Sequence, residues 1–151
     1  MRMSMMVKYA TKIDMEDEFL RISPDMSIET IIKEILPQKP HRESGGMGEN
    51  IITPILAAYV MEGDKPVGII DRDTLLEAIA VQNRDLKETR AKDIMKPPVL
   101  FNENTPVQDV LNTIIDNGLL TVAIVEDEKL IGIISVFDAF FLQKEIDSAN
   151  K

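Results

Sequence analysis

An internal repeat constrains the fold of this chain more than any other feature of its sequence. Residues 67–70 and 131–134 each hold three apolar residues around one glycine, and their offset is 131 minus 67, or 64. Upstream, the segments that begin at Ile28 and Val107 both place apolar residues at i, i+3, i+4, i+7 and i+8, which is one face of a helix. Their offset is 107 minus 28, or 79, so copy one has 79 minus 64, or 15, extra residues before its last strand. The sequence therefore predicts a tandem duplication with an insertion in copy one.

Each copy is predicted to run strand, helix, strand, strand, helix, which gives an α/β (α+β) fold of two repeats. Repeat 1 covers residues 8–81 with a loop insertion at 37–50, a polar and solvated connection covers 82–90, and repeat 2 covers 91–146. A repeat of roughly 70 residues is marginal as an independent core. We therefore expect the two repeats to pack about a pseudo-twofold axis as one globule. The expected strands are residues 20–22, 55–61, 67–70, 99–101, 122–125 and 131–134.

Several helix boundaries carry capping residues. Ser27 is the predicted N-cap of a helix over residues 28–36. Thr105 is a predicted N-cap too, with Pro106 at the first helical position and Gln108 closing a capping box. Gly118 is expected to end that helix in the left-handed conformation.

The remaining helices are predicted from apolar spacing. Residues 9–15 are expected to form a short helix, and a longer one begins at about Arg72, with Leu75, Leu76 and Ile79 on its buried side. The closing helix holds more apolar residues over 137–142 than one face can hide in a small domain, which indicates a homodimer.

Composition excludes several functions. Seventeen basic residues against 26 acidic ones give a formal charge of −9, which opposes binding to nucleic acid. No apolar run approaches the roughly 18 residues that span a bilayer, and we see no signal peptide, so no membrane partner is expected. Without cysteine the chain has no disulfide, thiol nucleophile or zinc–thiolate site. These features agree with a cytoplasmic location.

The insertion at 37–50 has no periodicity and is predicted to be a loop. It gathers Lys39, His41 and Arg42 in an otherwise acidic protein, close to three glycines. No Gly-Lys-Ser/Thr sequence follows, so the match to a phosphate-binding P-loop is poor. A surface loop and a basic lid over an anionic ligand are the two interpretations.

The end of the repeated strand in copy two carries polar residues in a specific order. Gly132 is followed by Ser135 and then by Asp138, where the strand is expected to become a helix. A serine three residues before an acid is typical of a capping box, so a purely local role is one interpretation. The other is a ligand site, because a carboxylate accepts two adjacent hydroxyl hydrogen bonds and a helix N-terminus attracts an anion.

The two repeats resemble a tandem pair of cystathionine-β-synthase (CBS) domains, known as a Bateman module. The resemblance rests on Asp93-Ile94-Met95 before a short strand, on the helix begun by Thr105-Pro106, and on residues 131–138, where Gly132, Ser135 and Asp138 match the family's nucleotide motif. It implies clefts between the repeats that bind AMP, ADP, ATP or S-adenosylmethionine, and dimers of the module.

The resemblance also implies roles for individual residues. Asp138 would take the ribose hydroxyls, Ser135 the phosphate side, and Gly132 would let a ligand approach the backbone. Val99, Met95 and Thr121 complete the predicted site. No metal is expected, and beyond the adenosine-containing ligand the cofactor is left open.

Copy one departs from the motif, because Asp71 stands at the serine position and Thr74 at the acid position. An ionised Asp71 would repel a phosphate, although it remains a good N-cap. We therefore expect this cleft to be empty, weak, or adapted to a ligand without phosphate there. Asp71 and Asp73 are too few ligands for a metal site.

Two classes of function remain open. The first is a regulatory module that senses an adenosine-containing ligand, and the second is a dimerisation module that works without one. An enzyme is not expected, because the single histidine lies in the insertion and no catalytic triad or metal-ligand set is apparent.

Overall fold

The structure is a computed structural model that describes residues 19–35, 39–42, 50–53 and 55–149. The chain divides into two compact units. The first unit is Asp14–Pro97, and the second joins Pro98–Lys151 with Met1–Ile13. The helix predicted at residues 9–15 lies outside the described residues.

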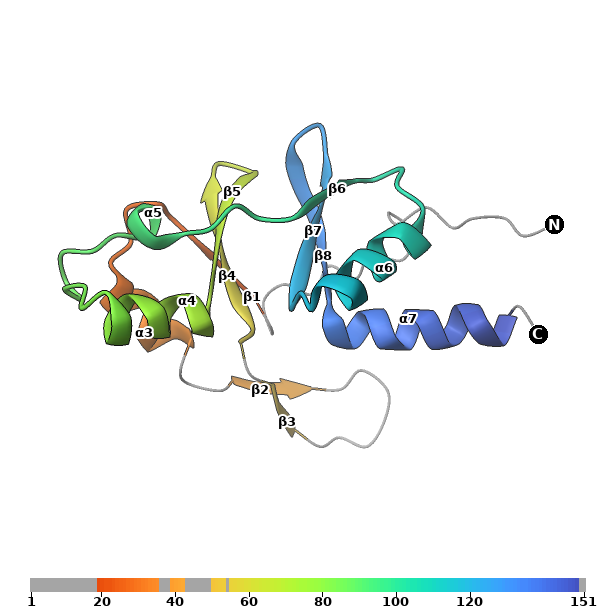
Figure 1. Cartoon of the computed structure of the whole chain (residues 1–151), viewed down its shortest axis with the longest axis horizontal. Coiled ribbons are helices and arrows are strands. Elements are labelled where there is room, and N and C mark those ends of the chain that lie inside the picture. The colour runs from red at the N-terminus through yellow and green to blue at the C-terminus, as the bar shows by residue number, and fades with distance from the viewer. Residues whose placement is uncertain (1–18, 36–38, 43–49, 54, 150–151) are drawn as a thin grey trace. The chain divides into compact units, whose positions relative to one another are not determined.

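The first unit contains a three-stranded sheet in the order β1-β4-β5, with β1 parallel to β4 and β4 antiparallel to β5 (Figure 1). Its first two helices follow the strands in the predicted order, and α4 continues into the π-helical turn η1. The elements are β1 (Phe19–Ile22), α3 (Ile28–Ile35), β4 (Ala57–Glu62), β5 (Lys65–Asp71), α4 (Arg72–Leu76), η1 (Glu77–Val81) and α5 (Ala91–Ile94).

The second unit repeats this arrangement, with the sheet order β6-β7-β8 and the same strand directions. The pairing register shifts between Val60 and Met61 in the first sheet and between Ile124 and Val125 in the second, which are 64 residues apart. The duplication predicted from the sequence is therefore confirmed down to this irregularity. The elements are β6 (Leu100–Asn102), α6 (Val107–Asn117), β7 (Thr121–Glu126), β8 (Lys129–Ser135) and α7 (Val136–Ala149).

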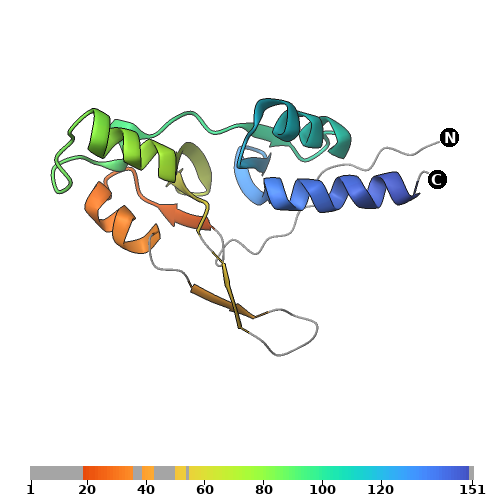
Figure 2. The same cartoon turned by 60° about the horizontal axis from the view of Figure 1, so that its bottom comes forward.

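The insertion in copy one is not only a loop, as its sequence predicted. Strand β2 (Lys39–Arg42) lies within it and pairs antiparallel with β3 (Asn50–Thr53), which begins at its last residue (Figure 2). Two short strands can satisfy each other's backbone groups without an alternating apolar pattern, so periodicity gave no sign of them. Residues 43–49, which hold the three glycines, lie outside the described part.

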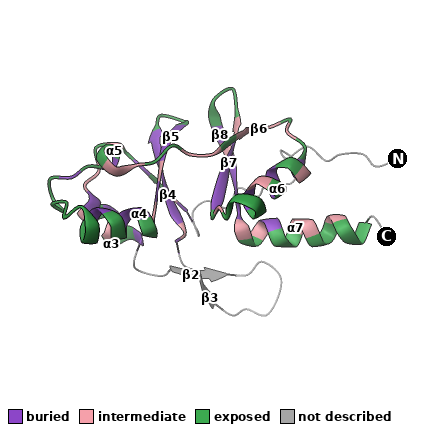
Figure 3. Ribbon diagram, in the orientation of Figure 1, coloured by how far each residue is buried: buried purple, intermediate pink, exposed green. Residues whose placement is uncertain are grey.

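Each unit has its own apolar core, in which residues of the sheet pack against α3 or α6 and against at least one later helix (Figure 3). The periodic residues of α3 and α6 that the structure describes pack into these cores as predicted, except that Ile115 is 43% exposed, whereas Leu36 lies outside the described residues. The fully or nearly fully buried members are Ile28, Ile31 and Ile35 in α3 and Val107, Val110, Leu111 and Ile114 in α6.

The predicted helix caps hold in two places and fail in one. Ser27 Oγ accepts a hydrogen bond from the Thr30 N–H at 3.2 Å, and Gly118 ends α6 with a left-handed φ of 60°. The capping box at Thr105 is wrong, because α6 begins at Val107 and its N-cap is Pro106. The Gln108 amide donates instead to Asn112 and Gln143. The Pro106 carbonyl accepts the first helical hydrogen bonds, so Thr105 lies one residue too early.

The segment between the copies is not a merely solvated connection. The carbonyls of Leu86 and Thr89 accept hydrogen bonds from the N–H groups of Glu29 and Ile28, each at 3.0 Å. These N–H groups belong to the first turn of α3, where an isolated helix leaves its donors without partners. The polar segment therefore caps α3 through its backbone, which the side-chain pattern could not indicate.

Residues 91–97 belong to the first compact unit, although the repeat in sequence places them in copy two. Lys96 exchanges two backbone hydrogen bonds with Ile69 of β5, at 2.9 and 3.0 Å, and Ala91 N–H donates to the Met26 carbonyl at 2.8 Å. The boundary between the two compact units therefore falls after Pro97, whereas the second sequence repeat begins at residue 91.

Candidate functional site

The residues predicted to bind a ligand gather mainly at one end of the second sheet. Strands β6 and β7 are parallel and begin at this end, whereas β8 is antiparallel and finishes there. Thr121 opens β7 and lies opposite Ser135, the last residue of β8. Val99 precedes β6, and its carbonyl accepts a hydrogen bond from Ala123 N–H at 2.9 Å. The topology therefore brings Val99, Thr121, Ser135 and Asp138 to the same end of the sheet.

Ser135 and Asp138 form a reciprocal capping box at the start of α7. The Asp138 N–H donates to Ser135 Oγ at 3.1 Å, and the Ser135 N–H donates to Asp138 Oδ2 at 3.2 Å. Ser135 is fully buried and Asp138 is half-buried. The local role suggested by the sequence is therefore present.

The capping box leaves two polar groups unused. Because Ser135 Oγ acts as an acceptor, its hydroxyl proton remains free to donate. Asp138 Oδ1 accepts no hydrogen bond from the described part of the chain. One donor and one carboxylate oxygen are thus left at the start of a 14-residue helix, in a combination that suits a ligand with hydroxyl and anionic groups.

The other two predicted residues lie elsewhere. Gly132 is buried within β8 opposite Ile124, three residues and therefore about 10 Å of strand from Ser135. Met95 belongs to the first unit, where it packs on Gly68 of β5. A Cβ atom on Gly68 would lie 2.3 Å from the Met95 sulfur, so this contact requires glycine.

Copy one has the same helix start with its polar residues exchanged. Asp71 is the N-cap of α4, and its Oδ1 accepts hydrogen bonds from both the N–H of Thr74, at 2.8 Å, and its hydroxyl, at 2.9 Å. Thr74 is buried. The hydroxyl proton that copy two leaves free is therefore already used in copy one.

An apolar groove in the first unit was not predicted. It has a volume of about 230 Å³ and lies between α3 and the helix formed by α4 and η1, which run side by side in Figure 2. The sequence placed Leu75, Leu76 and Ile79 on a buried face, but only Leu75 is buried, and Leu76 is 62% exposed. Thr74 and Leu75 are the buried neighbours on α4, so Leu76, about 100° further round the helix, points outward. The groove is lined by Ile32, Ile35, Arg72, Leu75, Leu76 and Ile79.

Within the described ranges, no three His, Cys, Asp or Glu side chains are grouped in a way that could hold a metal ion. None of the helices in those ranges is both long and apolar enough to cross a membrane.

Comparison with known proteins supports one family. The family model of the CBS domain matches residues 91–145. An uncharacterised protein of Methanopyrus kandleri is 36% identical over 81 residues, which make up 52% of this chain and 41% of that protein. The chain thus spans about two fifths of the length of this relative.

Solved structures match almost the whole chain. A CBS domain-containing protein of Thermotoga maritima has a TM-score of 0.67 at 20% identity, over 95% of this chain and 97% of that one. A CBS domain protein of Pyrobaculum aerophilum complexed with AMP has a TM-score of 0.65 at 16% identity, over 94% of this chain and 99% of that one. These likenesses concern the fold, which in both units is the strand-helix-strand-strand-helix repeat described above. Residues 91–145 are therefore a CBS domain, and the chain as a whole has the fold of the tandem CBS-domain proteins.

Proposed function

We propose that this chain is a regulatory, non-catalytic module that binds an adenosine-containing ligand at the Ser135–Asp138 end of the second sheet. The observation that carries the proposal is the pair of groups left unused by the capping box, the Ser135 hydroxyl proton and Asp138 Oδ1. The AMP bound by the similar Pyrobaculum protein supports the ligand class. Suitable ligands are AMP, ADP, ATP and S-adenosylmethionine.

In this proposal each residue has a chemical role. Asp138 Oδ1 accepts hydrogen bonds from the ribose hydroxyls, because a carboxylate oxygen has two lone pairs. Ser135 and the N-terminal N–H groups of α7 face the phosphate side, where the helix dipole favours negative charge. Val99 and Thr121 flank this end of the sheet. Gly132, within β8, and Met95, in the first unit, were also predicted from the resemblance, and no role at this end of the sheet is assigned to them.

We propose that the corresponding end in copy one binds a nucleotide weakly or not at all. Asp71 places a carboxylate at the position where Ser135 would meet a phosphate, and Thr74 has no free hydroxyl proton. The negative charge of the Asp71 carboxylate would repel the negative charge of a phosphate bound there, and no donor from Thr74 would offset this repulsion.

Thermal unfolding with a panel of adenine nucleotides and S-adenosylmethionine tests the ligand class. A ligand at 100 times its dissociation constant should stabilise the fold by about 2.7 kcal/mol. A melting temperature that none of these compounds changes at millimolar concentration would remove the proposal.

Calorimetry with Asp138→Asn tests the site. The amide oxygen can still accept the Ser135 N–H, so the cap is kept, while the charged acceptor for the ribose is lost. Losing such a partner typically costs about 1.5–3 kcal/mol, so the affinity should fall by roughly one to two orders of magnitude. Asp71→Asn makes the same chemical change in copy one and should leave the affinity nearly unchanged. Equal effects of the two variants would contradict the assignment to copy two.

A second candidate is a dimerisation module that needs no ligand. It is favoured by the capping box, which gives Ser135 and Asp138 a complete local role, and by three exposed phenylalanines on α7. In both cases we propose a homodimer. Light scattering at micromolar concentration should give twice 17.0 kDa, and a single species at the mass of one chain would exclude the dimer while leaving ligand binding to be judged by the melting experiment.

A further inference from the structure

Strands β2 and β3 form a two-stranded ribbon that is a sheet of its own within the first unit (Figure 2). Copy two has no counterpart of this ribbon, because α6 leads into β7 without a strand between them. Within the described residues, neither β2 nor β3 pairs with the sheet of β1, β4 and β5, so both outer edges of the ribbon are open there. An open edge presents backbone N–H and C=O groups, and a two-stranded ribbon alone is only marginally stable in water. The ribbon therefore offers a place for a further strand.

Pro40 distinguishes the two edges of the ribbon. In an antiparallel pair of strands, opposite residues exchange either both backbone hydrogen bonds or none. Pro40 lies opposite Ile52 and has no N–H, so this pair exchanges none, and the backbone groups of both residues point outward. The edge of β2 therefore lacks a donor at Pro40, whereas the edge of β3 presents the N–H and C=O groups of Ile52 and, two residues earlier, of Asn50. Of the two edges, that of β3 is better suited to pairing.

The charges of the ribbon favour the same edge. Strand β2 carries Lys39, His41 and Arg42, whereas the sequence of β3, Asn-Ile-Ile-Thr, has no charged residue. Two copies joined at β2 would set these basic residues against each other. Two copies joined at β3 keep their β2 strands three strand spacings apart, about 14 Å, which exceeds the Debye length of about 8 Å at physiological ionic strength. Repulsion between the basic strands is then largely screened.

We propose that β3 pairs antiparallel with β3 of a second copy, so that the two ribbons form a four-stranded sheet in the order β2-β3-β3-β2. A twofold axis perpendicular to the sheet places a strand antiparallel to its own copy. With Ile51 opposite Ile51 of the second copy, Asn50 and Ile52 of one strand lie opposite Ile52 and Asn50 of the other, and these pairs exchange hydrogen bonds. A register centred on Ile52 would set Asn50 opposite Pro54, which has no N–H to donate. The register centred on Ile51 uses all the outward backbone groups of Asn50 and Ile52.

The same features stop the assembly at two copies. The four-stranded sheet ends on both sides with β2, whose outer edge lacks the Pro40 donor and carries the basic residues. Proline and lysine on an edge strand are devices that prevent further pairing. Because the contact is the same patch on both copies, it closes on itself and does not extend into a fibre.

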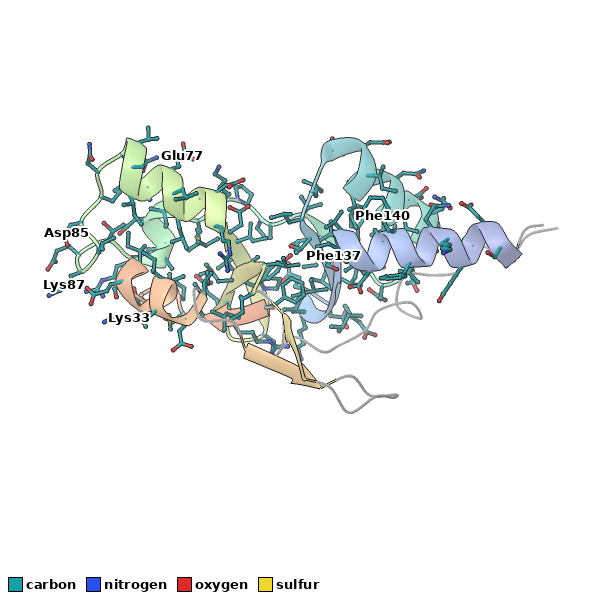
Figure 4. The ribbon with its side chains drawn as sticks, turned by 90° about the horizontal axis from the view of Figure 1, so that it is seen from below. Lys33, Glu77, Asp85, Lys87, Phe137 and Phe140 are labelled. Atoms are coloured by element: carbon teal, nitrogen blue, oxygen red, sulfur yellow. The ribbon has the colours of Figure 1, made fainter. Side chains whose placement is uncertain are left out.

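The inference rests on the homodimer proposed above and gives it a contact that no helix supplies. Phe137 and Phe140, which Figure 4 labels on α7, are not part of it, and neither are Ser135 and Asp138. Two strands of four residues bury less area than a standard interface, so a dimer held by this contact alone is expected to be weak. A covalent trap is therefore the suitable test.

Disulfide trapping tests the contact directly, because the chain has no cysteine of its own. Ile51→Cys protein is mildly oxidised. A pair that exchanges no hydrogen bonds has Cα atoms about 4.5 Å apart, within the roughly 7 Å that a disulfide allows, so this single variant should form a covalent dimer. Ile52→Cys is the matched control. Its two cysteines would lie on a diagonal, about 7–8 Å apart, and should cross-link about tenfold more slowly.

Removing one outward donor gives an independent readout. Ile52→Pro deletes an N–H that the ribbon itself does not use, as Pro40 does on the other edge. Each strand then loses one intermolecular hydrogen bond, so the rate of cross-linking through Ile51→Cys should fall by about tenfold. Ile52→Val keeps the N–H and should leave this rate unchanged. Circular dichroism checks that the variants melt at the same temperature.

The outcomes separate this contact from the homodimer itself. A dimer in solution in which Ile51→Cys forms no disulfide would reject the contact and retain the homodimer. Equal trapping of Ile51→Cys and Ile52→Cys, or no effect of Ile52→Pro, would also overturn the contact, because neither result agrees with its register. A monomer at all concentrations, without trapping, would reject both, while nucleotide binding would still be judged by the melting experiment.

Discussion

The starts of α4 and α7 hold the same position in the two copies, yet they leave different groups available. In copy two, both hydrogen bonds of the cap come from backbone N–H groups, so the Ser135 hydroxyl and one oxygen of Asp138 stay free. In copy one, the Thr74 hydroxyl donates to Asp71 and is consumed. Both arrangements cap a helix well. Either pair of side chains can cap the helix and keep the same backbone geometry at its start. The order of the acid and the hydroxyl residue decides which hydrogen-bonding groups remain available to a ligand.

Separating the copies should have the largest effect. A fragment of about 54 residues, from Pro98 to Lys151, can bury only about 60% of its unfolded surface and lies near the lower limit for independent folding. We expect it to lose the cooperative thermal transition of the whole chain or to self-associate. Circular dichroism and light scattering measure this. A monomeric fragment with a sharp thermal transition would show that copy two folds independently of copy one.

Exchanging the polar pairs should reverse the difference between the copies. Ser135→Asp with Asp138→Thr gives copy two the pattern of copy one, and nucleotide affinity should fall by about one to two orders of magnitude. Asp71→Ser with Thr74→Asp makes the opposite exchange and should increase nucleotide binding by copy one. Isothermal titration calorimetry measures both the affinity and the number of nucleotides bound per chain in each variant. Unchanged affinity in the first variant would show that residue order is not the deciding feature.

The contact between Gly68 and Met95 should have a smaller effect, on stability alone. Gly68→Ala brings a Cβ atom against the Met95 side chain, and such overpacking typically costs about 1–3 kcal/mol. In a Met95→Ala background the same change should be nearly neutral, because the side chain it meets is gone. A double-mutant cycle by chemical denaturation measures the coupling. Equal costs in both backgrounds would contradict the steric explanation.

The helix caps should give the smallest difference. Ser27→Ala removes the side-chain cap of α3 and should lower the free energy of unfolding by about 1 kcal/mol. Thr105→Ala, before the equivalent helix α6, should change it by less than about 0.5 kcal/mol, because Thr105 does not cap that helix. Equal losses would restore Thr105 as a cap.

Local patterns predicted most of the backbone. The apolar spacing located α3 and α6, and the repeated segments around Gly68 and Gly132 located β5 and β8. Strands β2 and β3 were missed, because two strands that pair only with each other need no apolar alternation. The backbone caps supplied by Leu86 and Thr89 were missed because any residue can offer a carbonyl.

The sequence by itself determined the duplication, the order of the repeated elements and the residues at the starts of α3, α4 and α7, since these depend on periodicity and on short-range side-chain chemistry. Only the tertiary structure decided that Met95 packs on Gly68 of copy one and that Leu76 and Ile79 border a groove. Each of these depends on a contact or an exposed face that is settled only when distant segments pack together. Sequence spacing places a residue on an element, but its neighbours in space determine what its side chain can still do.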